Sequence, residues 1–205
     1  GQVVTTSTND GQQFESEYGF IAIGRKADLS FLGQLSDQLA LQPDQSIQID
    51  EFGQTSIEGL YAIGDVTGTP MTANRATMQA RIAVEHLIKG QETVLYPSNF
   101  IEAVYTNPAV AQIGKMVNDD SLAITIKKEY SELLKTNIRN QTAGFVKICV
   151  DKNSGLILGA SGFGDHIPDL MALIQVAMNN NISYNDLNKT PLAYPSVSEL
   201  ITNLD

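Results

Sequence analysis

Residues 60–65 constrain the fold more than any other stretch of the chain. Leu60-Tyr61-Ala62-Ile63 is a short apolar run that stops abruptly on Gly64-Asp65. The run predicts a buried strand. Glycine lets the backbone come close to a ligand, and the aspartate puts a carboxylate at the carboxyl end of a strand, where open sheets bind ligands. We therefore expect Asp65 to accept hydrogen bonds from a sugar-like polyol.

Residues 71–88 predict a helix that begins just after this turn. Alanine and larger apolar residues recur there at helical spacing, and Gly90 fits the position after the last turn. A helix start presents unpaired backbone N–H groups and the positive end of the helix dipole. This start is therefore placed to stabilise negative charge on a ligand. An ordinary amphipathic helix explains the apolar stripe but not its position.

The chain before residue 55 predicts short strands separated by turns. Residues 3–6 are β-prone, and Asn9-Asp10-Gly11 reads as a hairpin turn. Residues 20–23 predict a buried strand that ends on Gly24-Arg25. Two further segments follow: a helical connector at residues 29–41 and an alternating strand at residues 46–50.

A change in composition over residues 91–99, where Tyr96-Pro97-Ser98 interrupts the pattern, predicts a domain boundary. Beyond it the pattern becomes α+β. It comprises strands at residues 101–105 and 122–130, a hairpin over 144–164, a helix at 168–179, and a helix start capped by Ser183 and Asp186. The expected fold class is thus an α/β region followed by an α+β domain.

The composition restricts partners and location. The 205 residues carry a net charge of -10, and 42% of them are apolar, as in a globular protein. Without a basic patch, neither nucleic acid nor an anionic membrane is an expected partner. No apolar run is long enough to span a bilayer, and the polar start does not resemble a signal peptide. We expect a cytoplasmic protein.

Cys149 is the only cysteine, which excludes an intrachain disulfide and a multi-thiolate metal site. We therefore expect no metal. The residue lies in the middle of a predicted strand, so a buried and unreactive thiol is expected.

The run from Thr55 through Gly59 and Tyr61 to Gly64-Asp65 resembles the FAD-contacting segment of the class I pyridine nucleotide-disulfide oxidoreductases. Dihydrolipoamide dehydrogenase, glutathione reductase, mercuric reductase and soluble transhydrogenase belong to this family. Further blocks match in family order, at residues 106–114 and over the hairpin at 144–164. The resemblance extends from about residue 14 to residue 203.

The resemblance implies FAD and NAD(P)H as cofactors. It assigns Gly24 to the neighbourhood of the nicotinamide nucleotide, although a plain turn glycine is an equal alternative. The remaining cofactor contacts that it implies are Gly64, Asp65, Met71, Thr72, Ala73 and Asn74. It also implies three regions: residues 1–28 as the end of the NAD(P)-binding domain, residues 29–95 as the C-terminal part of the FAD-binding domain, and residues 96–205 as the dimerisation domain.

The redox-active cysteine pair and both Gly-x-Gly-x-x-Gly fingerprints of the family are absent from these residues. The chain therefore resembles the C-terminal half of such an enzyme. Its expected partners are the N-terminal half of the same enzyme and a second copy, bound through residues 96–205. Alone, the chain is expected to bind FAD weakly or not at all and to be inactive.

Tyr194 replaces the histidine that serves as general acid-base in the disulfide reductases, whereas the glutamate that orients this histidine is kept as Glu199. A tyrosine, with an ordinary pKa near 10, does not shuttle protons at neutral pH as imidazole does. Dithiol chemistry is therefore less expected, and the motif looks most like that of soluble transhydrogenase. His86 and His166 lie outside the motif and are expected to be surface or capping residues.

Two functions remain open from the sequence. The first is part of an FAD-dependent oxidoreductase that passes hydride from NAD(P)H to FAD and then electrons to a disulfide or another acceptor. The alternative is a non-catalytic dimerisation or interaction module that keeps the fold without flavin.

Overall fold

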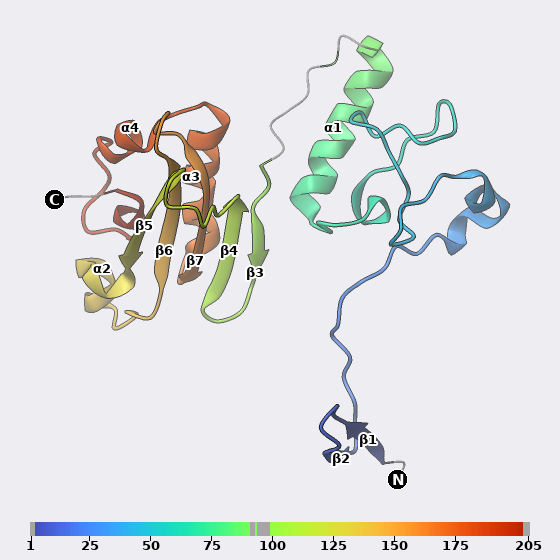
Figure 1. Cartoon of the computed structure of the whole chain (residues 1–205), viewed down its shortest axis with the longest axis horizontal. Coiled ribbons are helices and arrows are strands. Elements are labelled where there is room, and N and C mark those ends of the chain that lie inside the picture. Colours follow the sequence, from blue (N-terminus) through green and yellow to red (C-terminus); the bar gives the residue numbers. More distant parts are fainter. Residues whose placement is uncertain (1–2, 91–92, 94–98, 203–205) are drawn as a thin grey trace.

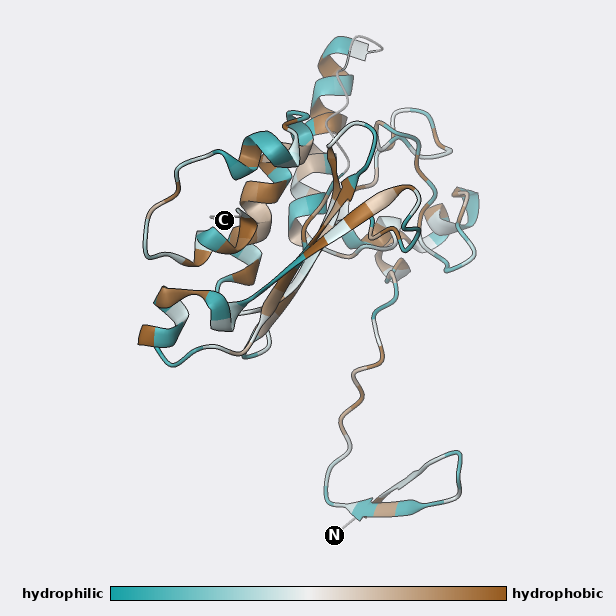
Figure 2. Cartoon of the chain, turned by 60° about the vertical axis from the view of Figure 1, so that its left-hand side comes forward, coloured by the Kyte–Doolittle hydropathy of each residue, from teal (hydrophilic) through white to brown (hydrophobic). Residues whose placement is uncertain are grey.

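The computed structural model describes residues 3–90, 93 and 99–202. In Figure 1 the antiparallel sheet and its helices form the left part of the molecule, and helix α1 with its loops forms the right part. A small N-terminal hairpin stands apart from both, at the end of an extended stretch (Figures 1 and 2). The domain boundary predicted at residues 95/96 lies outside the described residues.

The second half of the chain forms a five-stranded antiparallel sheet with the order β3-β4-β7-β6-β5. The predicted strands and the hairpin over residues 144–164 are confirmed. The strands are β3 (Glu102–Val104), β4 (Ala109–Gly114), β5 (Ala123–Glu129), β6 (Phe145–Asp151) and β7 (Ile157–Gly164). Buried and exposed residues alternate along β4, as expected for a sheet with one covered face.

Helix α3 (Ile167–Asn179) covers one face of the sheet and confirms the helix predicted at residues 168–179. Its buried residues Met171 and Ile174 pack with Ile113 and Ile148 of the strands in one hydrophobic core. The short helices α2 (Leu134–Ile138) and α4 (Tyr184–Asn188) flank this core, and Ser183 caps α4 by accepting a hydrogen bond from the Asp186 amide, as predicted.

Helix α1 (Ala73–Lys89) begins two residues later than predicted and ends at Gly90, whose amide bonds the His86 carbonyl oxygen. A second, smaller core lies beside it, built around Leu39, Ile47 and Ala62. The predicted helical connector is a 3-10 helix (Ser30–Gln38) that is interrupted at Gly33.

The strands predicted at residues 46–50 and 60–63 are not regular strands. They form only the isolated bridges Leu41↔Ile47 and Gln54↔Tyr61. Residues 20–23, predicted to be a buried strand, are extended and exposed, with Phe20 94% accessible. A strand is stable only when neighbouring strands accept and donate its backbone hydrogen bonds. The described residues offer these three segments no such sheet.

The predicted N-terminal hairpin is confirmed as β1 (Val4–Ser7) paired with β2 (Gln13–Ser16). No helix among the described residues is long and apolar enough to cross a membrane. Cys149 is buried, as predicted, and its sulfur accepts a hydrogen bond from the Val117 amide at 3.5 Å.

Candidate functional site

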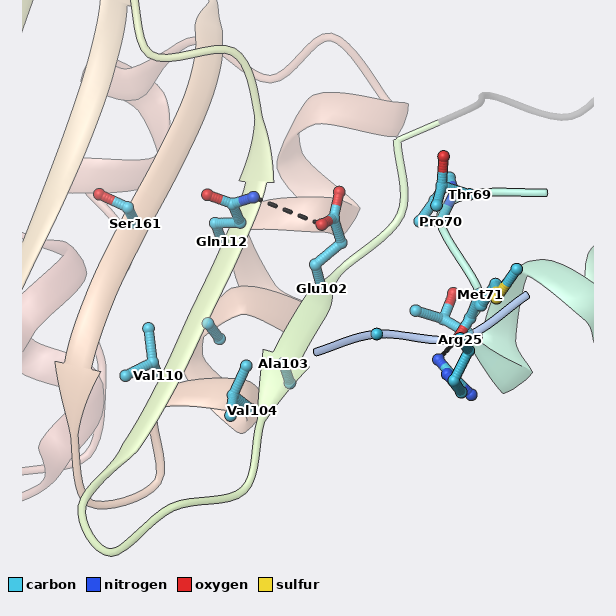
Figure 3. Close-up of a pocket in the computed structure, with 13 residues that line it drawn as sticks. Arg25, Thr69, Pro70, Met71, Glu102, Ala103, Val104, Val110, Gln112 and Ser161 are labelled. Carbon is cyan, nitrogen blue, oxygen red and sulfur yellow. Dashed lines mark hydrogen bonds between the residues drawn. The ribbon is translucent and has the colours of Figure 1, made fainter. Parts of the chain in front are cut away.

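A pocket of about 860 Å³ lies between the sheet and the start of α1 (Figure 3). One wall comes from the end of the extended N-terminal stretch and the loop before α1, and the other from strands β3, β4 and β7. Its lining residues are Gly24, Arg25, Thr69, Pro70, Met71, Thr72, Glu102, Ala103, Val104, Val110, Ala111, Gln112 and Ser161. Three of the predicted cofactor contacts, Gly24, Met71 and Thr72, are thus in one pocket.

Asp65 is connected to this pocket through Arg25. The Arg25 guanidinium lies 3.0 Å from Asp65 Oδ2 and also donates to the carbonyl oxygen of Met71. Both side chains of the ion pair remain about half or more exposed, at 63% for Arg25 and 49% for Asp65. The carboxylate therefore keeps access to solvent and can accept further hydrogen bonds.

Gly64 gives the chain the turn that the sequence predicts. Its φ of 75° lies in the left-handed region, where glycine is favoured, and its amide donates to Gln79 Oε1 at 2.7 Å. Gln79 Nε2 in turn donates to Thr67 Oγ1 at 3.1 Å, and this hydroxyl donates to the Gly64 carbonyl oxygen at 2.8 Å. This hydrogen-bonded ring holds the Gly64-Asp65 turn against α1.

Arg75 fixes the loop between Asp65 and α1. Its Nη1 donates to the carbonyl oxygens of Gly68 at 2.8 Å and Pro70 at 3.3 Å. Burial lowers the pKa of Arg75, and the charge of Asp65 opposes this change. The sequence reasoning missed Arg75 and Gln79; their spacing of four on α1 was the available signal, because it puts both on the face toward the Gly64 turn.

The start of α1 presents hydrogen-bonding groups without protein partners. Thr72 is the N-cap residue, and its Oγ1 is buried without a partner among the described residues. The amides of Ala73 and Asn74 belong to the first turn, where no intrahelical acceptor is available. A second pocket of about 470 Å³ includes Met71, Thr72, Ala73 and Asn74 in its lining. Asn74 Nδ2 donates to the Ile101 carbonyl oxygen at 2.9 Å, which ties α1 to the segment before β3.

These groups fit one edge of a flavin nucleotide. The helix start supplies backbone donors and a positive dipole end, and the unpartnered Thr72 hydroxyl adds a further polar contact. The Asp65 carboxylate supplies acceptors for the hydroxyl groups of a polyol. Gly64 contributes through the turn rather than through its amide, since Gln79 already binds that amide.

Tyr194 and Glu199 lie away from this pocket and do not line it. Tyr194 is 68% exposed and precedes a cis peptide bond to Pro195. Glu199 is buried and accepts a hydrogen bond from the Ser196 amide at 2.6 Å, closing a capping box at the start of a 3-10 helix (Val197–Ile201). Within residues 99–202 no hydrogen bond joins Tyr194 to Glu199, so the glutamate shapes the turn that follows the tyrosine.

The sequence predicts that both histidines are surface or capping residues. This prediction is wrong for His86, which is buried, and is confirmed for His166, which is half-exposed at a helix start. The His86 ring is buried, stacks on Phe52 at 4.2 Å between centroids, and its Nδ1 lies 2.8 Å from the Tyr61 hydroxyl. Phe52 and Tyr61 enclose it because α1 packs on the loops before the Gly64 turn. His166 is half-exposed at the N-cap of α3, 3.5 Å from Asp165 and 3.3 Å from Asp169.

Comparison with known proteins finds the family that the sequence motifs resemble, and the similarity extends over most of the chain. Residues 1–80 match the family profile described as pyridine nucleotide-disulphide oxidoreductase, and residues 101–204 match its dimerisation domain. A dihydrolipoyl dehydrogenase from Buchnera aphidicola subsp. Schizaphis graminum is 32% identical over 186 residues, which are 89% of this chain and 39% of that protein. An NAD(P)H dehydrogenase (quinone) from Mycobacterium tuberculosis is 29% identical over 98% of this chain and 42% of its own length.

The fold is also that of a solved relative. The crystal structure of LpdA from Mycobacterium tuberculosis superposes with a TM-score of 0.86 at 28% identity, covering 97% of this chain and 44% of that one. The chain thus spans less than half the length of each of these relatives. Since the match to the dimerisation domain alone covers more than half of the chain, and the two matches together include the residues of the site, the chain belongs to the pyridine nucleotide-disulphide oxidoreductase family.

Proposed function

We propose that this chain is the cofactor-contacting and dimerising part of an FAD-dependent NAD(P)H oxidoreductase. FAD, when bound, accepts a hydride from NAD(P)H and passes electrons on to an acceptor. The part of this chain is to hold one edge of the flavin at the start of α1 and to form one wall of the space through which the nicotinamide ring approaches.

The observation that carries the proposal is the shared pocket. Gly24, expected near the nicotinamide nucleotide, lines the same cavity as Met71 and Thr72, expected at the flavin. These residues are more than 40 positions apart in sequence, and the Arg25 guanidinium links their two segments through Asp65 and Met71. A cavity bordered by both groups of residues is what hydride transfer between two bound rings requires.

Tyr194 bears on the kind of electron acceptor that the enzyme uses. An exposed tyrosine replaces the family's acid-base histidine. Neither described histidine is paired with it: the His86 ring contacts the Tyr61 hydroxyl, and His166 contacts Asp165 and Asp169. We therefore propose an acceptor that needs no general acid-base at this position, in preference to a dithiol. Glu199 contributes by fixing the turn that presents Tyr194.

We further propose a cytoplasmic homodimer formed through residues 96–205, with residues 1–28 and 29–95 belonging to the nucleotide-binding and flavin-binding domains. Two separate hydrophobic cores, one before residue 67 and one from residue 101 onward, support the division. The outer face of α3 supports the dimer, because Leu173 and Val176 remain 42% and 57% exposed there. The remaining flavin-binding half of the enzyme is the other proposed partner.

An anaerobic titration of the complete gene product with NADH and NADPH tests this function. The expected result is a yellow protein whose flavin absorbance is bleached by one equivalent of reduced nucleotide per flavin. The isolated 205-residue chain, incubated with FAD and then separated from free FAD by gel filtration, is expected to be colourless. A colourless dimeric gene product would contradict the proposal and favour a dimerisation module without flavin.

A further inference from the structure

Three polar residues form a row across the sheet wall of the pocket. Glu102 of β3 pairs in register with Gln112 of β4, which pairs with Ser161 of β7. All three line the pocket, and Figure 3 shows Glu102 and Gln112 side by side, opposite the two segments that carry Arg25 and Met71. The residues around this row, Ala103, Val104 and Val110, are apolar.

The Glu102 carboxylate is not fully paired. Its hydrogen bond from Gln112 Nε2 is long, at 3.4 Å, and reaches only Oε2. No other hydrogen bond or ion pair to this carboxylate exists among the described residues. Glu102 is exposed, and an ionised carboxylate offers only acceptors. A ligand that fills the pocket and covers this carboxylate therefore has to replace its water with N–H or O–H donors and without negative charge.

The two walls restrict the ligand further. Pro70 and Met71 on one side and Val104 and Val110 on the other suit a flat ring. The polar group on that ring has to be a donor where it meets Glu102 and can be an acceptor where it meets the Gln112 amide. A carboxamide combines both, with its NH2 and its carbonyl oxygen.

We infer that Glu102 is a specificity-determining residue that binds the carboxamide NH2 of the nicotinamide ring, with Gln112 held beside it by their hydrogen bond. This inference rests on the proposed function, because it assumes that the pocket receives a nicotinamide nucleotide. It adds a residue on the dimerisation sheet to the nucleotide site.

The test compares NAD+ with its 3-acetylpyridine analogue, in which a methyl group replaces the amide NH2. Equilibrium binding of both to the oxidised gene product is measured by calorimetry, so that no turnover is needed. The unaltered protein is expected to bind NAD+ about tenfold more tightly than the analogue, as one hydrogen bond to a charged group provides. Glu102→Ala is expected to reduce this preference to about twofold by weakening NAD+ binding alone.

Two variants keep the result interpretable. Glu102→Gln retains a neutral acceptor and an almost identical shape, so an intermediate preference is expected even if Glu102→Ala is poorly folded. Glu15→Ala removes the same charge from the remote N-terminal hairpin and should leave the preference at tenfold. Equal preference in the unaltered, Glu102→Gln and Glu102→Ala proteins would overturn the inference while leaving the proposed function intact. A gene product that retains flavin but binds neither NAD+ nor NADP+ would overturn both.

Discussion

Arg25 Nη1 lies 3.0 Å from Asp65 Oδ2, across 40 positions of sequence, and the same guanidinium binds the Met71 carbonyl oxygen. Through these contacts one side chain attaches the extended N-terminal stretch to the Gly64-Asp65 turn and to the start of α1. The pocket exists because this attachment brings Gly24 opposite the sheet. The ion pair therefore acts on the geometry of the site more than on the stability of the fold.

Arg25→Ala should accordingly detach the extended N-terminal stretch from the Gly64-Asp65 turn and leave the free energy of unfolding nearly unchanged. An ion pair as exposed as this one contributes less than about 1 kcal/mol to the free energy of unfolding. Trypsin should nevertheless cut after Lys26 several-fold faster, because the stretch loses its attachment. Limited proteolysis followed by mass spectrometry measures the rate. Arg139→Ala, which removes an ion pair to Asp165 in the other half, is the control and should leave cleavage at Lys26 unaltered.

Asp65→Ala should reduce flavin retention in the complete gene product by about tenfold, since a carboxylate that accepts hydrogen bonds from hydroxyl groups is lost. The variant also loses the pair with Arg25, so Arg25→Ala separates the two effects. Flavin release during dialysis, followed by absorbance, should increase in Asp65→Ala and change little in Arg25→Ala. Equal release from both would attribute the effect to the ion pair instead of the carboxylate.

The elements whose stabilising contacts are local in sequence could be predicted from sequence. Such local contacts stabilise the two hairpins and the helices α3 and α1. Each of these elements was predicted to within a few residues, including the end of α1 at Gly90. The segments at residues 20–23, 46–50 and 60–63 have strand composition but no neighbouring strands among the described residues. Apolar composition alone did not reveal this, because pairing is a property of the whole sheet.

The site divides in the same way. The turn at Gly64-Asp65 and the helix start after Pro70 could be predicted, because a turn and a helix start are short-range patterns. The sheet wall could not, since Glu102, Gln112 and Ser161 meet only through the register of three strands. Burial of His86 likewise depends on Phe52 and Tyr61, which are distant in sequence.

Tyr194→Phe should leave reduction of the flavin by NAD(P)H unchanged within a factor of two. Tyr194 is exposed and does not line the pocket where hydride transfer is proposed. Stopped-flow absorbance of the flavin measures the rate. A large loss of rate in Tyr194→Phe would place this hydroxyl close to the hydride step and contradict the assignment of Tyr194 away from it.

Tyr61→Phe should lower the free energy of unfolding by about 1–2 kcal/mol, although only one hydroxyl is removed. The Tyr61 hydroxyl is the hydrogen-bond partner of His86 Nδ1, and His86 Nε2 is already buried without a partner among the described residues. The variant leaves both ring nitrogens unpaired in a buried site, which costs more than a lost surface contact. Urea denaturation measures the change. Tyr105→Phe, at a residue that is 84% exposed, should show almost none.

Tyr130 should make the protein sensitive to alkali. Burial, together with the negative charge of Asp165, raises the pKa of Tyr130 above its ordinary value of 10.0, and its hydroxyl donates to the Asp165 carbonyl oxygen. In the unfolded chain this hydroxyl loses its proton near pH 10, whereas in the folded chain it keeps it. The contribution of Tyr130 to stability is therefore complete below pH 10 and is lost as the pH rises above 10, by up to about 1.4 kcal/mol per pH unit.

Tyr130→Phe cannot titrate, but it lacks the hydrogen bond to Asp165, so at pH 7 it should be less stable than the unaltered protein by about 1 kcal/mol. Because only the unaltered protein then loses the contribution of Tyr130, the difference should shrink and reverse between pH 10 and pH 11.5. Urea denaturation at a series of pH values measures it. Tyr18→Phe, at a residue that is 86% exposed, should run parallel to the unaltered protein throughout. A constant difference for Tyr130→Phe would show that the folded state releases this proton as readily as the unfolded chain does.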